Sequence, residues 1–396
     1  MDYVGLAKEY GTPLYVYDGA CVRRQYQTLY NAIPYPNKRI LYAMKANFNP
    51  HILRILKQEG AGIDAVSVGD ILMALKCGFN PRDILFTANK ITDTEMHEAQ
   101  KLGVLFNIGS LSRLEKYGAA YPGTRVCVRL NPDVVAGAHE FIKTGGESTK
   151  FGILLQDIDK VVDICRAHNL TVVGIHEHTG SGIPETVKMM QGIQNILNVV
   201  TKERFPHLEF MDFGGGFKVA YKPTEDQLDY SMFGQQVSDM FKEFCDAYGT
   251  PLSMYFEPGK YLVAESGSLI VEVTTLKQNR RKRIAGVNSG FAQLIRPMFY
   301  QAYHHITNLS NDGIKQVYDI VGNICESGDC FAVDRAVSTI KEGHLLRIHT
   351  AGAYCYSMGS VYNLRALPRE VVVDDTVHAS RVVTNTELVD SLFDRY

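Results

Sequence analysis

Eight short β-rich runs, separated by helix-like segments, make up most of the first part of the chain. The runs lie at 39–46, 62–67, 83–88, 104–110, 125–132, 172–180, 210–217 and 253–259. The intervals contain segments such as PHILRILKQEG and DIDKVVDICRAHN, whose apolar residues recur at helical spacing. Regular alternation of strand and helix favours a parallel sheet covered by helices, and eight such strands predict a TIM-like (β/α)8 barrel.

The pattern changes after about residue 265. SLIVEVTTLK, QVYDIVGNI, HLLRIHTAGAY and REVVVDD alternate or are rich in β-branched residues, with few helical signals. We therefore expect an all-β carboxy-terminal domain, a β-barrel or sandwich, which LYVYD at 14–18 could join. The predicted boundaries give a barrel at 20–265 and a β domain made of 1–19 and 266–396.

Composition excludes several classes of protein. A net charge of −2 gives no electrostatic reason to bind nucleic acid or an anionic membrane, and the basic run at 277–283 is expected to be a solvated turn. The eight cysteines form no CxxC pair, as is typical of reduced thiols in a cytosolic enzyme. The amino terminus has no signal-peptide pattern, so we expect a cytoplasmic protein without a membrane span.

Lys45 ends the first β-rich run, in LYAMKANFNP. Partial burial disfavours the charged ammonium and leaves a free amine, the form that Schiff-base chemistry with pyridoxal phosphate requires. The alternative is an ordinary lysine that reaches solvent from a strand end. The other strand ends decide between the two, because function in such barrels lies at the carboxyl ends of the strands.

Polar and glycine residues gather at those other ends. They are Asp64 in the second run, His178 at the end of the sixth with Ser181 in the loop that follows, Gly214, Gly215 and Gly216 at the end of the seventh, and Glu257, Pro258, Gly259 and Lys260 at the end of the eighth. Glycines let backbone N–H groups approach a phosphate, and the Ser181 hydroxyl could add a donor. His178 could stack on a pyridine ring, whose nitrogen Glu257 would keep protonated as an electron sink. Each feature alone has a plainer explanation, as a turn or a structural histidine, but together they favour a pyridoxal phosphate site without a metal.

Seven ordered motifs resemble those of the fold-type III pyridoxal phosphate decarboxylases. They are YAMKAN, HEHTGSG, GGGF, EPGK, RPMFYQAYH, CESGD and YNLR, and the resemblance covers about residues 10 to 375. Within this family the chain most resembles the diaminopimelate decarboxylase branch. The resemblance implies a barrel plus a β domain, in a homodimer whose two active sites lie at the subunit interface.

The resemblance also implies roles for individual residues. Lys45 is similar to the Schiff-base lysine, Glu257 to the partner of the ring nitrogen, and His178 to the stacking histidine. Cofactor-binding positions are expected at Asp64, Ser181, Gly214, Gly215, Gly216, Pro258, Gly259, Lys260 and Tyr362. Cys325 and Glu326 match a pair delivered from the partner subunit, where the cysteine is the expected proton donor. Substrate-binding positions are expected at Lys260, Arg296, Tyr300, Glu326 and Tyr362.

The expected reaction is decarboxylation of meso-2,6-diaminopimelate to L-lysine and carbon dioxide, the last step of lysine biosynthesis. A guanidinium suits the distal carboxylate of this substrate, and Arg296 fits that need, while Glu326 fits the distal amine. Two departures from the family pattern bear on the substrate: EPGK places Lys260 where arginine is usual, and ALPREV follows Arg365 where RPRPAEV is usual.

Three alternatives remain open. The first is a decarboxylase of another basic or conjugated amino acid, of the ornithine, lysine or arginine type, which Lys260 keeps possible. The second is an amino acid racemase, against which Glu257 argues, because racemases of this group place a cation on the ring nitrogen. The third is a non-catalytic regulator on a decarboxylase scaffold, although such proteins tend to lose the lysine or the glycine loop that this chain keeps.

Overall fold

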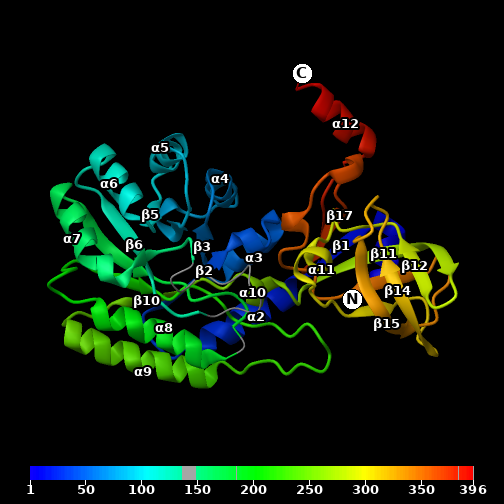
Figure 1. Cartoon of the computed structure of the whole chain (residues 1–396), viewed down its shortest axis with the longest axis horizontal. Coiled ribbons are helices and arrows are strands. Elements are labelled where there is room, and N and C mark those ends of the chain that lie inside the picture. Colours follow the sequence, from blue (N-terminus) through cyan, green and yellow to red (C-terminus); the bar gives the residue numbers. More distant parts are fainter. Residues whose placement is uncertain (136–148, 184, 382, 396) are drawn as a thin grey trace. The chain divides into compact units, whose positions relative to one another are not determined.

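The structure is a computed structural model that describes residues 1–135, 149–183, 185–381 and 383–395 (Figure 1). The chain divides into two compact units. The barrel unit consists of Arg23–Lys218 and Gln227–Leu262, and the β unit of Met1–Val22, Val219–Asp226 and Val263–Tyr396. Val219–Asp226, which the sequence places inside the barrel domain, therefore clusters with the β unit.

Eight parallel strands of the described chain form a closed ring, so the barrel prediction is confirmed. Each strand overlaps one of the eight predicted runs, although β8, β9 and β10 end three to five residues before the runs at 172–180, 210–217 and 253–259 do. They are β2 (Lys38–Ala43), β3 (Gly62–Ala65), β4 (Ile84–Phe86), β5 (Leu105–Ile108), β6 (Arg125–Asn131), β8 (Thr171–His176), β9 (Phe210–Asp212) and β10 (Ser253–Phe256). Pairing of β10 with β2 closes the ring, and β7 (Ile153–Leu154) adds to β6 outside it. A core cluster inside this unit joins Leu41 of β2, Leu85 of β4, Cys127 of β6 and Phe210 of β9, which are alternate strands of the ring, with Val173 of the intervening β8.

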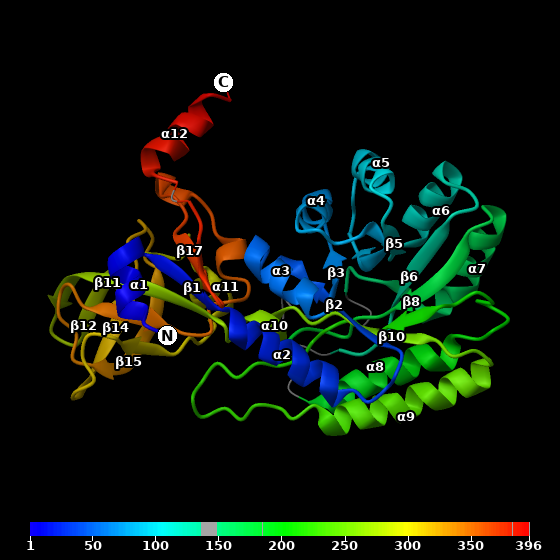
Figure 2. The same ribbon diagram turned by 180° about the vertical axis from the view of Figure 1, so that it is seen from behind.

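Helices connect the strands of the barrel unit (Figures 1 and 2). They are α2 (Gly19–Ala32), α3 (Pro50–Gln58), α4 (Val68–Lys76), α5 (Asp93–Lys101), α6 (Leu111–Ala120), α7 (Ile158–Ala167), α8 (Thr186–Val199) and α9 (Ser231–Tyr248). Local capping explains where several begin: Asn49 and Ser67 each accept a backbone N–H, and Thr92 forms a reciprocal capping box with Glu95.

The β unit is built on one mixed sheet. Its strands are β1 (Leu14–Asp18), β11 (Gly267–Gln278), β12 (Arg283–Val287), β13 (Ile306–Asn308), β14 (Lys315–Val321), β15 (Cys330–Ser338), β16 (Leu345–Ile348), β17 (Arg369–Val373) and β18 (Val377–Ala379). β1 pairs antiparallel with β11 and parallel with β17, so LYVYD lies in the middle of this sheet. The unit also contains helices α1 (Tyr3–Tyr10), α11 (Arg296–Tyr300) and α12 (Asn385–Phe393), which the sequence analysis did not predict.

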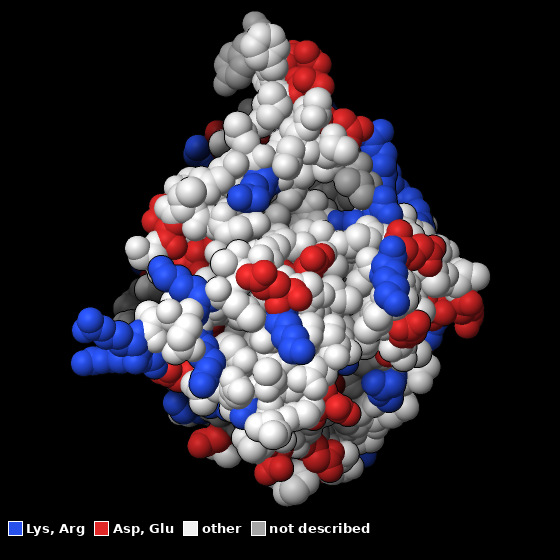
Figure 3. Space-filling model, turned by 90° about the vertical axis from the view of Figure 1, so that its right-hand side faces the viewer, with Lys and Arg blue, Asp and Glu red and all other residues white. Residues whose placement is uncertain are grey.

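Charged side chains of both signs lie at the surface of the described chain (Figure 3). The basic run at 277–283 forms the exposed turn between β11 and β12, as predicted, and the Asn279 side chain accepts backbone N–H groups from Arg281 and Lys282. Figure 3 shows basic and acidic side chains interspersed over one face. In the described part of the chain, no helix has the length and apolar character to cross a membrane.

Candidate active site

Lys45 lies directly after β2, in a single 3₁₀ turn formed by Met44–Ala46. Its Nζ is 2.5 Å from Oδ2 of Asp64, which is on β3 and fully buried. The lysine side chain itself is 42% exposed, so its amine lies at the rim of the barrel mouth rather than within the core. Burial raises the pKa of Asp64, an effect strengthened by Glu257 and opposed by the Lys45 ammonium.

Three buried side chains converge at the ends of neighbouring strands. His176 ends β8, Asp212 ends β9 and Glu257 follows β10, and one ligand atom of each lies within 4.8 Å of the others. His176 Nε2 is 3.0 Å from Glu257 Oε2. Burial raises the pKa of both carboxyl groups and lowers the pKa of His176.

This cluster is short of hydrogen-bond partners. Among the described residues, Asp64 Oδ1 and His176 Nδ1 are buried without a hydrogen bond, and no N–H group donates to Glu257 Oε1 or Asp212 Oδ2, whose carboxyl groups meet each other. Most buried polar atoms in folded proteins are paired, and an unmade hydrogen bond costs about 1–3 kcal/mol. Such a concentration of unpaired acceptors is typical of a site that a ligand with a hydrogen-bond donor completes.

His178 lies two residues beyond β8 and is half-buried. Its Nδ1 accepts the backbone N–H of Gly215 at 3.1 Å. Burial lowers the pKa of His178 well below its usual value, so the ring is neutral and its proton resides on Nε2. A neutral, oriented imidazole suits stacking against a flat ligand.

The glycine loop after β9, Gly214–Gly216, packs closely against the backbone of neighbouring segments. Gly214 and Gly216 have φ of +62° and +108°, a region that side chains disfavour. A Cβ at Gly215 would lie 2.4 Å from the carbonyl oxygen of Glu257. Gly216 also accepts the backbone N–H of Ile183 at 2.9 Å, which joins the loop to the segment that contains Ser181. The loop therefore presents backbone, without side chains, next to the acidic cluster.

The turn after β10 is tied to the end of β2. The Ala43 N–H donates to the carbonyl of Pro258 at 3.2 Å, and a Cβ at Gly259 would be 3.1 Å from Ala43. Lys260, half-buried, opens the short helix α10 (Lys260–Val263). The structure thus brings the first and eighth strand ends together, as the predicted site requires.

Sequence reasoning missed four buried residues of this mouth: Arg129, His176, Glu177 and Asp212. Arg129, on β6, lies over the Phe151 ring at 4.9 Å. Its positive charge interacts favourably with four buried carboxyl groups, those of Asp64, Glu177, Asp212 and Glu257. Its signal was an arginine inside the apolar run RVCVRLNP. Burial raises the pKa of Glu177 to about 8, while Thr179 donates a hydrogen bond to its carboxylate.

The other predicted residues lie in the β unit and form two groups. In the first group, the Tyr362 hydroxyl donates to Glu326 at 3.0 Å, and the Cys325 N–H donates to Asn363 at 3.1 Å. The Cys325 thiol belongs to an exposed residue. This group therefore brings Cys325, Glu326 and Tyr362 together on one surface.

Arg296 and Tyr300 belong to the second group, on α11. Arg296 is buried, lies over the Tyr221 ring at 4.4 Å and bonds His304 at 3.0 Å. Burial and the neighbouring guanidinium lower the pKa of His304 to about 3, so this histidine is neutral. No carboxylate pairs with Arg296 within the described residues, so it is not a surface salt-bridge residue.

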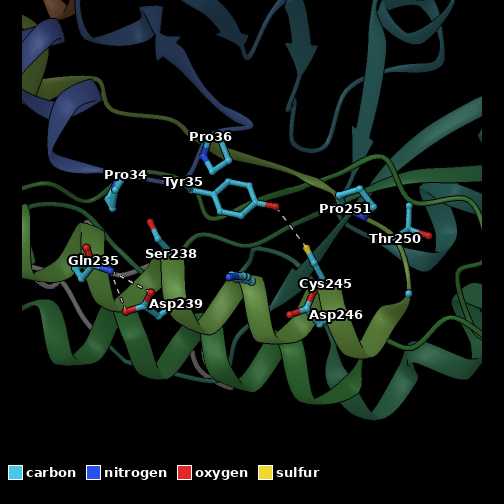
Figure 4. Close-up of a pocket in the computed structure, with 12 residues that line it drawn as sticks. Pro34, Tyr35, Pro36, Gln235, Ser238, Asp239, Cys245, Asp246, Thr250 and Pro251 are labelled. Atoms are coloured by element: carbon cyan, nitrogen blue, oxygen red, sulfur yellow. Dashed lines mark hydrogen bonds between the residues drawn. The ribbon is translucent and has the colours of Figure 1, made fainter.

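A groove of about 650 Å³ lies at the opposite end of the barrel (Figure 4). Pro34, Tyr35 and Pro36 precede β2, and Pro251 precedes β10, which places it at the amino ends of the strands. The Tyr35 hydroxyl donates to the Leu252 carbonyl at 2.9 Å. Its size does not make this groove the active site, because the unpaired acceptors lie at the other end.

The residues at the mouth fit pyridoxal phosphate. A protonated pyridine nitrogen would give Glu257 Oε1 the donor that it lacks, and the glycine loop offers the close backbone approach that a phosphate needs. Lys45 supplies an accessible amine beside the buried Asp64. No part of this arrangement requires a metal ion, although His176, Asp212 and Glu257 could together hold one.

Comparison with known proteins gives a consistent result. Residues 20–264 match the family described as pyridoxal-dependent decarboxylase, pyridoxal binding domain. The chain is 42% identical over 381 residues to the diaminopimelate decarboxylase of Methanothermobacter thermautotrophicus, covering 94% of this chain and 89% of that protein. It is 34% identical over 404 residues to the enzyme of the same name from Escherichia coli K12, covering 98% and 94%. The crystal structure of diaminopimelate decarboxylase from Helicobacter pylori complexed with L-lysine is 29% identical and superimposes with a TM-score of 0.92 over 100% of both chains.

Proposed function

The chain belongs to the diaminopimelate decarboxylases, a branch of the pyridoxal-dependent decarboxylases, and on this premise we propose that it converts meso-2,6-diaminopimelate to L-lysine and carbon dioxide. The observation that carries the chemistry is the buried Glu257, whose Oε1 receives no N–H donor within the described chain and whose carboxyl group otherwise meets His176 and the equally acidic Asp212. An acceptor of this kind is what a protonated pyridine nitrogen requires. A racemase of this fold would present a cation there instead.

Pyridoxal phosphate, when bound, supplies a carbonyl carbon that condenses with amines and a ring that accepts the electron pair left by the departing carboxylate. Lys45 holds the cofactor through its amine, and Asp64 orients that amine through the 2.5 Å contact. Glu257 would hold the ring nitrogen in its protonated form, and the neutral His178 would stack on the ring and exclude water from it. Gly214, Gly215 and Gly216 bind the phosphate, with Ser181 as an added donor.

Arg296 supports the choice of substrate. Its buried guanidinium sits between the Tyr221 ring and the neutral His304, so no negative side chain neutralises it in the described structure. A desolvated, uncompensated guanidinium binds a carboxylate strongly and in a fixed orientation. We assign it to the distal carboxylate of the substrate, with Tyr300 and Lys260 as further substrate contacts.

We assign Glu326 to the distal amine of the substrate and Tyr362 to a further substrate contact. The hydrogen bond between them holds the Glu326 carboxylate in place, and Cys325 beside it is exposed. An exposed thiol next to these groups is consistent with delivery to the active site of a second chain, where Cys325 would donate the proton that replaces the carboxylate. We therefore propose a homodimer with shared active sites, and a cytoplasmic enzyme that keeps its cysteines reduced.

The proposal is tested by carbon dioxide release from a panel of amino acids: meso-diaminopimelate, ornithine, lysine and arginine. Because an analogue without the distal carboxylate leaves Arg296 buried and unpaired, we expect kcat/KM for diaminopimelate to exceed the others by roughly 10²-fold or more. The Arg296→Lys variant should lose most of this preference, since lysine cannot bond bidentately. A wild-type preference for ornithine would reject the assignment, and the Lys45→Ala variant gives the background.

A further inference from the structure

A cavity of about 230 Å³ lies within the β unit, and none of the residues assigned above lines it. The end of α1, the loop after β12, the loop before β17 and the first residue of α12 surround it. Two of its lining residues are arginines, Arg365 and Arg369, and its described lining contains no aspartate or glutamate. The cavity therefore has a strongly positive wall.

The neutral polar groups of the lining are already engaged. Asn288 donates to the Thr12 hydroxyl at 2.9 Å, and Gln293 donates to the carbonyl of Ala366 at 3.0 Å. The Asn385 side chain accepts the Ala366 N–H at 2.9 Å. These bonds fix the wall in place and leave the two guanidinium groups as its charged members, with Nε of Arg369 buried and without an acceptor among the described residues.

Neither arginine has an anionic partner in contact. No salt bridge involves Arg365 or Arg369 in the described chain, and Nε of Arg369 is buried without an acceptor. Arg369 does lie over the ring of Tyr10, at 5.5 Å. Asp329 attracts Arg365 electrostatically but forms no salt bridge with it in the described chain, and its two carboxylate oxygens accept the N–H groups of Phe291 and Ile324.

We propose that this cavity binds a small oxyanion, of the size and charge of inorganic phosphate. Two guanidinium groups that line one cavity supply forked donors for tetrahedral or planar oxygens, and an anion would pair charges that the chain leaves unpaired. The groove at the base of the barrel (Figure 4) offers no such set, since Tyr35 and Ser238 are hydrogen-bonded to carbonyl groups and Gln235 to Asp239. The oxyanion site is independent of the decarboxylase activity proposed above.

Calorimetric titration of inorganic phosphate into the holoenzyme tests the proposal. The holoenzyme is required because bound pyridoxal phosphate already fills the phosphate position of the glycine loop. At constant ionic strength we expect saturable phosphate binding to the wild type and at least a tenfold loss of affinity in Arg369→Gln. Phosphate should raise the melting temperature of the wild type but not that of Arg369→Gln. Arg283→Gln is the matched control, because Arg283 is exposed at the start of β12 and its loss removes the same charge.

Two results would overturn the oxyanion site. One is the absence of saturable phosphate binding to the wild-type holoenzyme, and the other is equal affinity in the wild type, Arg369→Gln and Arg283→Gln. If Arg369→Gln does not fold, Arg365→Gln takes its place with the same expectation and the same control. Neither result bears on carbon dioxide release, so failure here is distinguishable from failure of the proposed reaction.

Discussion

At the residue scale, the barrel mouth is defined by an excess of buried acid. Asp64, Asp212 and Glu257 all have raised pKa values because burial disfavours their ionised forms. The opposing cations are Lys45 and Arg129, and only Lys45 lies at the exposed rim. A cationic ring nitrogen that enters the mouth would relieve this imbalance, which is a physical reason for the cofactor to bind with its nitrogen toward Glu257.

Removal of the Lys45 amine should abolish turnover. In the Lys45→Ala variant we expect carbon dioxide release at least 10³-fold below the wild type, because no other described lysine is paired with the buried acid of the mouth. The variant should also lack the visible absorbance that a lysine-linked cofactor gives. Lys277→Ala, at an exposed position on β11, is the control and should retain both properties. Substantial residual turnover in Lys45→Ala would contradict the assignment of Lys45 as the lysine that binds the cofactor.

Glu177 should give the stability of the protein a measurable pH dependence. Its pKa is about 8 in the fold against 4.5 for the unfolded chain, so the folded state holds the extra proton between these values. The stabilisation from the bound proton is complete below pH 4.5 and is lost as pH rises through about 8. The free energy of unfolding should therefore already be lower by roughly 3 kcal/mol at pH 7 than at pH 4.5. Glu177→Gln, which cannot ionise, should flatten this decline in denaturant-unfolding experiments.

The matched control for Glu177 is Glu243→Gln, at an exposed position on α9. This variant should keep the wild-type slope of unfolding free energy against pH. If Glu177→Gln keeps that slope as well, the carboxyl group is not buried in its neutral form.

The sequence predicted some site residues and missed others for a physical reason. Lys45, Glu257 and the glycine loop stand beside turns, where their types are unusual enough to be noticed. His176 and Asp212 are the last residues of their strands, and which face of a strand points inward depends on the closure of the ring. The sequence shows that the segment from His176 to His178 is a polar strand end. It does not show that His176 is the residue of this segment that contacts Glu257.

At the element scale, the glycine loop should tolerate no side chain at Gly215. We expect Gly215→Ala to lose roughly 2 kcal/mol of stability and most of its affinity for pyridoxal phosphate, because its Cβ would lie 2.4 Å from a backbone oxygen that cannot move independently. Gly69→Ala is the control, since its nearest neighbour is at 3.5 Å on a serine side chain. Cofactor affinity is measured by absorbance titration, and a wild-type value for Gly215→Ala would contradict this role of the loop.

Element prediction succeeded where periodicity is strong. The eight barrel strands follow from alternation of apolar runs and helical segments, but the helices of the β unit do not. α12 was missed although Thr384 and Glu387 form a capping box, since its polar sequence shows only a narrow apolar stripe. α1 was missed because the aromatic residues near the amino terminus resemble those of the adjacent strand.

At the scale of the whole molecule, the proposed function depends on two chains forming a dimer with shared active sites. Cys325 and Glu326 lie in the β unit and Lys45 in the barrel unit. Periodicity and spacing describe a single chain, so the homodimer and the domain boundaries at 19/20 and 265/266 stay predictions. A complementation experiment addresses the dimer directly, because a shared site needs residues from two chains.

Lys45→Ala and Cys325→Ala chains should restore activity when they are mixed. If each active site combines Lys45 of one chain with Cys325 of the other, a mixed dimer contains one intact site and one doubly defective site. Random exchange of equal amounts then yields about a quarter of the wild-type carbon dioxide release, whereas each variant alone remains inactive. Dissociation and reassociation of each variant by itself is the control. If the mixture is no more active than its components although exchange of subunits is verified by mass, each chain must complete its own site, and Cys325 must act within the chain that carries Lys45.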